Sequence, residues 1–212
     1  MIHLVDAENI RDYRAEMDQA HCLRHQVFVE ESKWEELRKP DGREIDQFDD
    51  GRALHMLYIR DGAVLGYQRM LPTTRPHLLS DVLPDLCEGE RPVGPEVWEW
   101  TRYCVSRPHR ERGRALSPIA NSLLSGIVEW GLATGVSSII IEMDPIWLLR
   151  LVQLYFRVTP LGLPRRYGPS DVVAVTAKFD SRTLARLREM RGDTDSVLYQ
   201  PIHLETARSR LA

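Results

Sequence analysis

Residues 97 to 105 read Val-Trp-Glu-Trp-Thr-Arg-Tyr-Cys-Val, a run whose aromatic and β-branched residues predict a strand within the core. Two charged residues, Glu99 and Arg102, interrupt it. Burying a charge is costly unless it is paired, so each residue needs a partner, a cavity or both. Residues three apart in a regular strand face opposite sides of the sheet. Glu99 and Arg102 therefore serve different surfaces or belong to a structural ion pair, unless a bulge, a feature common beside active sites, reorients one of them.

The sequence on either side alternates between strand and helix patterns, which indicates a mixed α/β fold. The dipeptide Asp61-Gly62 predicts a hairpin, and Ser117-Pro118 predicts a capped helix that ends at Gly135. No repeat or break in composition divides the chain, so we expect one domain over residues 1–212 with a frayed carboxyl terminus of about ten residues. The expected strands are residues 2–5, 54–59, 63–71, 97–105, 136–142 and 172–179, and the expected helices are residues 10–27, 78–86, 117–133, 145–156 and 181–191.

The bulk composition excludes several classes of protein. The 212 residues are 43% hydrophobic and 28% charged. The net charge of −3 provides no excess of positive charge that would bind nucleic acid or an anionic membrane. Cys22, Cys87 and Cys104 form neither a CxxC pair nor an even disulfide set, which suits a reducing cytoplasm. The amino terminus lacks the regions of a signal peptide, and no apolar run approaches the roughly 20 residues that span a bilayer. We expect a cytoplasmic protein.

Two histidines on the first predicted helix, His21 and His25, have the spacing of a zinc site. The glutamate that serves as general base in the HExxH motif is missing between them. We therefore expect no metal.

Two further groups of charged residues are candidates for binding. Glu44, Asp46 and Asp49 form an acidic run that pairs with arginines elsewhere or, taken alone, is a solvated loop. The second group, Arg110 to Ala115 with Gly113 inside it, directly precedes the amino terminus of the helix at Ser117. Free N–H groups and the positive end of a helix dipole suit a pyrophosphate or phosphopantetheine arm, although an exposed basic turn explains the same residues.

These residues together resemble the signature of the LuxI-type acyl-homoserine-lactone synthases, the autoinducer synthases of bacterial quorum sensing. The resemblance is specific over the first half of the chain and weaker over the second. It implies a single-domain fold similar to the GNAT acetyltransferases, a three-layer sandwich in which a twisted mixed sheet carries helices on both faces. The matching motifs are Arg24-x-x-x-Phe28, Trp34, Glu44-Ile-Asp46-Gln-Phe-Asp49, Gly66-Tyr-Gln-Arg69-Met-Leu-Pro-Thr-Thr74 and Trp98-Glu99-x-x-Arg102.

The resemblance also implies a reaction. The enzyme would join an acyl group to the α-amine of S-adenosylmethionine and close a homoserine lactone, with no cofactor, and a LuxR-type receptor would read the product. Glu99 is the candidate base, directly or through water, with Asp46 assisting, and the backbone N–H groups near Tyr103 are candidates for stabilising the oxyanion. The residues implied to bind S-adenosylmethionine are Arg24, Phe28, Trp34, Asp46, Asp49, Arg69 and Arg102.

The acyl half of the reaction is less defined. Isoleucine at position 140, where family members that take 3-oxo chains often have threonine, argues against a 3-oxo substrate, and Trp147 suggests a short, branched or aromatic acyl group. The basic residues near Arg110 slightly favour acyl-coenzyme A (acyl-CoA) over acyl carrier protein. Alternatives are a GNAT-type transferase acting on another amine and a non-catalytic ligand-binding homologue. The residues assigned to the acyl donor and its pocket are Arg110, Gly113, Ala115, Ile140, Met143, Trp147 and Leu151.

Overall fold

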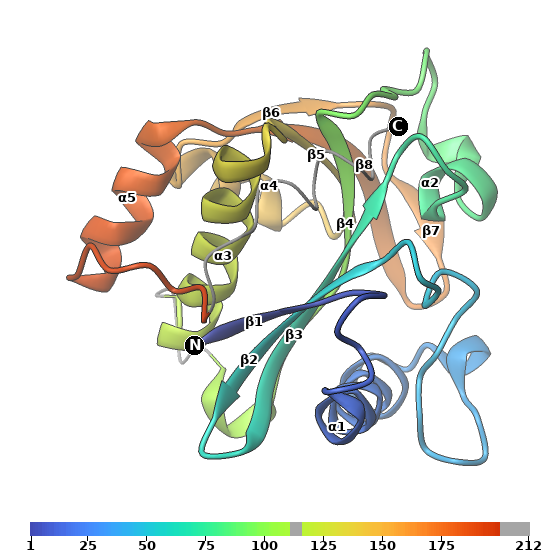
Figure 1. Ribbon diagram of the computed structural model, residues 1–212. Coiled ribbons are helices and arrows are strands. Elements are labelled where there is room, and N and C mark those ends of the chain that lie inside the picture. The colour runs from blue at the N-terminus through green and yellow to red at the C-terminus, as the bar shows by residue number, and fades with distance from the viewer. Residues whose placement is uncertain (111–115, 200–212) are drawn as a thin grey trace.

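The computed structural model describes residues 1–110 and 116–199 and shows one mixed sheet (Figure 1). Its strands follow the order β1-β2-β3-β4-β5-β8-β6, and β7 pairs with β8 outside this path. Every neighbouring pair is antiparallel except β4 and β5. The strands are β1 (Ile2–Val5), β2 (Leu54–Arg60), β3 (Ala63–Pro72), β4 (Val97–Val105), β5 (Ser138–Met143), β6 (Arg157–Pro160), β7 (Arg165–Tyr167) and β8 (Ser170–Lys178).

Helices cover both faces of the sheet, as Figure 1 shows. On one face, α3 (Pro118–Thr134), α4 (Trp147–Gln153) and α5 (Ser181–Arg191) pack on the main apolar core, where Trp98 of β4 meets Trp130 of α3 at a ring separation of 5.0 Å. On the other face lie α1 (Arg14–Arg24) and α2 (Leu78–Asp81), each over its own smaller core. The predicted three-layer arrangement is confirmed. None of the helices within the described ranges is long and apolar enough to cross a membrane.

Local sequence signals explain several elements. Asp61 and Gly62 adopt φ values of 52° and 75° between β2 and β3, the positive values that a two-residue hairpin turn requires. Ser117 caps α3 by accepting a hydrogen bond from the Ala120 N–H, and Gly135 ends that helix at φ 85°. The hairpin and the capped helix are thus confirmed, and the helix expected over residues 181–191 has those bounds.

Other elements differ from the prediction. The first helix starts later, at Arg14, and continues as a π-helix over His25–Glu31. The stretch expected as one helix at 78–86 is α2 followed by a 3-10 turn, Pro84–Leu86, because Pro84 lacks the N–H that continued helix would need. The short strands β6 and β7 were not predicted, since their residues are mostly exposed and carry no alternating apolar pattern.

The parallel pair β4 and β5 separates partway along its length. Pairing covers only Val97 to Glu99 against Ser138 to Ile140, after which β5 continues against β8. Within the described part of the chain, the second half of β4 therefore has no strand partner on that side. A cavity of about 360 Å³ lies between the diverging ends, lined by residues of both strands and of α4.

A bulge in β4 sits beside this opening. Tyr67 pairs with Cys104 and Arg69 with Thr101, so the single residue between them on β3 lies opposite two residues of β4. Arg102, inside the extra step, has φ 57°, a left-handed conformation that residues other than glycine rarely adopt. The bulge explains why Glu99 and Arg102 both contact elements on the α1 and α2 face of the sheet.

Candidate active site

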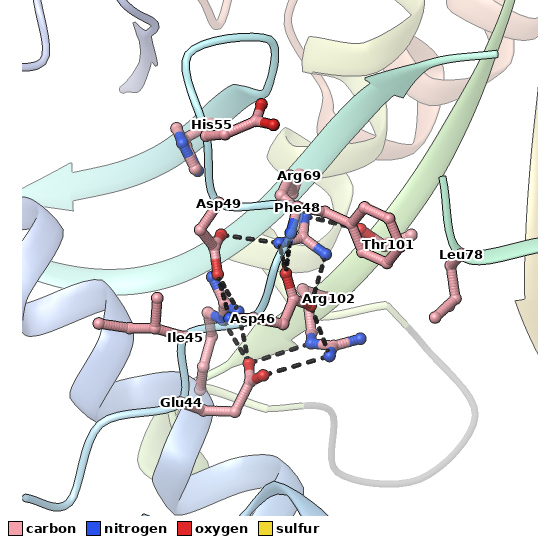
Figure 2. A network of polar contacts seen from close by, with 12 residues as sticks. Glu44, Ile45, Asp46, Phe48, Asp49, His55, Arg69, Leu78, Thr101 and Arg102 are labelled. Carbon is pink, nitrogen blue, oxygen red and sulfur yellow. Dashed lines mark hydrogen bonds and ion pairs between the residues drawn. The ribbon is translucent and has the colours of Figure 1, made fainter. Parts of the chain in front are cut away.

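Three arginines from three segments converge on three carboxylates of the loop after α1, and we call this group the arginine–carboxylate cluster (Figure 2). Arg24, at the end of α1, donates hydrogen bonds from both terminal nitrogens to Asp49, at 2.7 and 2.8 Å. Its Nε donates to Glu44 at 2.6 Å. The end of α1 is therefore fastened to the acidic loop at two points. The members of the cluster are Arg24, Glu44, Asp46, Asp49, Arg69 and Arg102.

The other two arginines belong to strands of the sheet. Arg69 of β3 donates from Nη1 to Asp46 and Asp49 at 2.6 and 2.7 Å, and its Nε donates to the Thr101 hydroxyl at 3.1 Å. Arg102 of β4 donates to Glu44 from Nε at 3.0 Å and to Asp46 from Nη2 at 2.8 Å. Each carboxylate thus joins two arginines, and the contacts form one continuous network.

The cluster is largely buried, and its formal charges balance. The side chains of Arg24 and Arg69 are fully buried, and that of Asp49 is only 3% exposed. Burial alone would raise the pKa of Asp49, but its hydrogen bonds from Arg24 and the charges of Arg24 and Arg69 hold that pKa well below the usual value. The pKa values of Asp46 and Glu44 are lowered in the same way, against burial. All three carboxylates are therefore ionised at neutral pH.

Arg102 is the member of the cluster that lines the cavity. Its guanidinium lies 5.7 Å from the centre of the Phe28 ring, which belongs to the π-helix and lines the same cavity. Nε and Nη2 of Arg102 are committed to carboxylates, whereas Nη1 makes no hydrogen bond to any residue that the structure describes (Figure 2). One cationic nitrogen is therefore available to a bound anion.

Glu99 is fully buried on the other side of the β4 backbone from the main core. Its carboxylate accepts hydrogen bonds from the backbone N–H groups of Leu78 and Leu79 at 2.8 and 2.7 Å. Nδ1 of His77 lies 2.7 Å from the same carboxylate. Glu99 does not line the cavity, so it does not reach a substrate there directly.

The apolar wall of the cavity comes from β4, β5 and α4. The Tyr103 ring packs edge-on against Trp147 at a ring separation of 6.2 Å, and the Arg150 guanidinium lies 4.8 Å from the centre of the Trp147 ring. Met143, Trp147 and Leu151, which the sequence assigned to the acyl pocket, all line it, as does Arg110. The structure therefore brings most of the predicted acyl-pocket residues together around one space.

Two predicted site residues lie outside the cavity wall, and two others cannot be placed. Ile140 does not line the cavity, because it packs in the small core beneath α2 with Val97 and Leu79. Trp34 is half-buried, and its backbone N–H donates to the Phe28 carbonyl, but the residue is not part of the cavity wall. The predicted anion-binding residues Gly113 and Ala115 lie outside the described residues.

Two residues that the sequence analysis missed stand beside Glu99. His77 is fully buried, and Glu142, on β5, lines the cavity. Glu142 interrupts an apolar strand after Ile139, Ile140 and Ile141, just as Glu99 interrupts β4. The argument that drew attention to Glu99 could therefore have found Glu142 too, whereas nothing in the sequence around His77 indicated its burial.

Comparison with known proteins is consistent with this geometry. The isovaleryl-homoserine lactone synthase of Bradyrhizobium diazoefficiens is 37% identical over 193 residues, which are 91% of this chain and 86% of that protein. The structure of BjaI, a CoA-dependent acyl-homoserine lactone synthase with SAM and isopentyl-CoA, matches with a TM-score of 0.91 at 35% identity, over 100% of this chain and 99% of that one.

The wider fold is that of the GNAT enzymes. A protein assigned as an N-acetyltransferase from Lactobacillus plantarum matches with a TM-score of 0.53 at 20% identity, over 84% of this chain and 97% of that one. This similarity concerns the fold alone. The autoinducer synthase family model matches residues 8–187. The chain therefore belongs to the autoinducer synthase family, the acyltransferases that make acyl-homoserine lactones.

Proposed function

We propose that this protein transfers a short, branched acyl group from acyl-CoA to the α-amine of S-adenosylmethionine and then closes the homoserine lactone. The observation that carries the proposal is the cavity between β4 and β5, which is lined both by apolar side chains and by Arg102. At about 360 Å³ it is near the lower limit of ordinary ligand sites, which span roughly 300 to 1,000 Å³. A relative is named for an isovaleryl product, and BjaI was solved with isopentyl-CoA.

The amino-acid end of S-adenosylmethionine fits the Arg102 side of the cavity. The free Nη1 of Arg102 suits its carboxylate, and the Phe28 ring beside it offers an aromatic face to the sulfonium cation. Arg24 and Arg69 are committed to carboxylates behind Arg102. We therefore assign them the role of positioning residues, with Arg102 making the contact.

The acyl end fits between β4 and β5. The thioester carbonyl would lie along the half of β4 beyond its pairing with β5, near the backbone N–H groups of Tyr103 and Cys104, where donors can stabilise an oxyanion. The neutral amine then forms the N–C bond as the C–S bond of the thioester breaks. In the second step a carboxylate oxygen forms a bond to the carbon next to the sulfonium, whose C–S bond breaks to release methylthioadenosine. Trp147 and Leu151 would bound the acyl chain and limit its length.

The test is product formation by the purified protein. Incubation of S-adenosylmethionine with isovaleryl-CoA should release methylthioadenosine and an acyl-homoserine lactone of matching mass, faster than with octanoyl-CoA or with isovaleryl acyl carrier protein. Release of CoA with other amines, without methylthioadenosine, would instead support a general N-acyltransferase. No methylthioadenosine from any donor contradicts the proposal.

The remaining expectations from the sequence stay part of this proposal. We propose that the reaction takes place in the cytoplasm, needs neither metal nor cofactor, and yields a lactone that a LuxR-type receptor reads. Mass spectrometry of the lactone made by expressing cells, and its activity in a receptor-based reporter strain, would test the acyl group and the partner together.

A further inference from the structure

A second carboxyl group lies between Glu99 and the cavity. Glu142, on β5, lines the cavity wall, whereas Glu99 is fully buried behind it. Oε1 of Glu142 is shielded from solvent and accepts no hydrogen bond from any residue within the described ranges. If Glu142 were ionised, this buried oxygen would have no hydrogen-bond donor, which is costly.

Glu99 pairs with Ile140 across β4 and β5, and Glu142 lies two residues further along β5, on the same face of the strand as Ile140. The two carboxyl groups are therefore neighbours, within hydrogen-bonding reach when one of them holds a proton. Adjacent buried carboxyl groups cannot both be ionised at low cost, so such a pair shares one proton. Two backbone N–H groups donate to Glu99, whereas Oε1 of Glu142 has no donor among the described residues. The proton therefore belongs on Glu142. In agreement, burial and then the Glu99 charge raise the pKa of Glu142 well above its usual value.

We propose that Glu142 is the residue that takes the proton from the substrate amine and relays it to Glu99. In this step the amine gives its proton to one oxygen of Glu142 while the proton on the other oxygen passes to Glu99. The amine becomes neutral and nucleophilic, Glu142 stays a neutral acid, and Glu99 becomes protonated. The inference rests on the proposed function, and it explains how a base buried as deeply as Glu99 serves a reaction in the cavity.

The charged groups facing this pair are few. Arg102 of β4 lies near Glu142, and Arg110 and Arg150 stand elsewhere on the cavity wall. His77, the residue directly before α2, contacts Glu99 through Nδ1, and its Nε2 is buried with no partner among the residues described. The arginines keep their charge at all working pH values. Changes in rate with pH near neutrality therefore report on the amine and on the Glu142 carboxyl group.

The decisive variant is Glu142→Gln, because its amide can still donate a hydrogen bond to Glu99 but cannot relay a proton. We expect kcat for methylthioadenosine release to fall ~100-fold or more at pH 7, with KM for both substrates nearly unchanged. The deficit should shrink as pH rises through about 8, where an α-amine loses its proton unaided. Glu189→Gln is the matched control, the same change on α5 at a side chain that is 70% exposed and outside the cavity wall, and it should lose less than about threefold.

Three results would overturn the proposal. They are a Glu142→Gln enzyme within threefold of wild type, an equal loss at every pH from 6.5 to 9.5, or a wild-type infrared spectrum with no protonated-carboxyl band at pH 7. The last measurement needs no variant, so a misfolded Glu142→Gln leaves the proposal testable. Failure of the wild type to release methylthioadenosine would instead count against the proposed function, which separates the two claims.

Discussion

Replacing Asp49 with asparagine tests whether the arginine–carboxylate cluster is as well shielded from solvent as its burial indicates. Asp49 accepts hydrogen bonds from both terminal nitrogens of Arg24, from Nη1 of Arg69 and from the backbone N–H of Asp46. Asparagine keeps the shape but turns one oxygen into an N–H donor that faces arginine donors. The cluster would then hold three cations and two anions with almost no water to screen the excess charge.

The expected cost follows from that imbalance. Breaking a buried ion pair from one side destabilises a protein by about 3 to 5 kcal/mol, because the remaining charge stays buried. For a chain of 212 residues this lowers Tm by roughly 6 to 20 °C. Asp50, the next residue, provides the matched control, since its carboxylate and that of its partner Arg52 are 36% and 44% exposed at their side chains. Asp50→Asn should cost no more than about 1 kcal/mol.

Urea denaturation followed by circular dichroism, at pH 7 and then at falling pH, is the assay. The folded pKa of Asp49 is lowered, so its contribution to stability is fully present above about pH 4 and is lost as pH falls below that value. The gap between wild type and Asp49→Asn should therefore narrow in acid. A loss below about 1 kcal/mol at pH 7, or equal losses for Asp49→Asn and Asp50→Asn, would show that the cluster is solvated.

Three further predictions concern other positions. Burial lowers the pKa of His55 to about 4, so the folded protein, which holds this ring neutral, should lose about 3 kcal/mol of its free energy of unfolding as pH falls from 6.5 towards 4. Urea titrations of His55→Gln should lack this part of the pH dependence. Glu99→Gln should lower kcat ~100-fold or more while leaving KM for S-adenosylmethionine within a fewfold range, and an unchanged kcat in steady-state assays would exclude Glu99 from proton transfer. Trp147→Ala should raise kcat/KM for octanoyl-CoA relative to isovaleryl-CoA by about tenfold, the scale of one or two methylenes in an apolar pocket, whereas Leu149→Ala, at a 66% exposed site on the same helix, should not change that ratio.

Much of the fold was predictable because its signals are local. The hairpin turn depends on Asp61 and Gly62 themselves, and the bounds of α3 depend on Ser117 and Gly135. The bulge was one of the alternatives open from the sequence, since a charge at both 99 and 102 required an explanation. Its position could not be chosen until the pairing of β3 with β4 was known.

The limits of prediction lie in contacts between distant segments. Ile140 was placed in the acyl pocket because it belongs to an apolar strand near the pocket, but side chains alternate along a strand, and its face of β5 turns towards α2. Glu142, two residues along on the same strand, lines the cavity, where the strands have already diverged. Only the end of pairing between β4 and β5 decides which of the two residues reaches a substrate.

The arginine–carboxylate cluster needs an explanation other than stability. Buried ionic clusters are often less stable than apolar side chains of similar volume, so the six charged groups must serve another purpose. Arg102 adopts a left-handed backbone that costs a residue with a side chain about 1 to 2 kcal/mol. Glu44 and Asp46 hold its Nε and Nη2, and both carboxylates are held in turn by Arg24 and Arg69. The network therefore fixes Arg102, the one member of the cluster that lines the cavity, and leaves its Nη1 directed to a bound substrate.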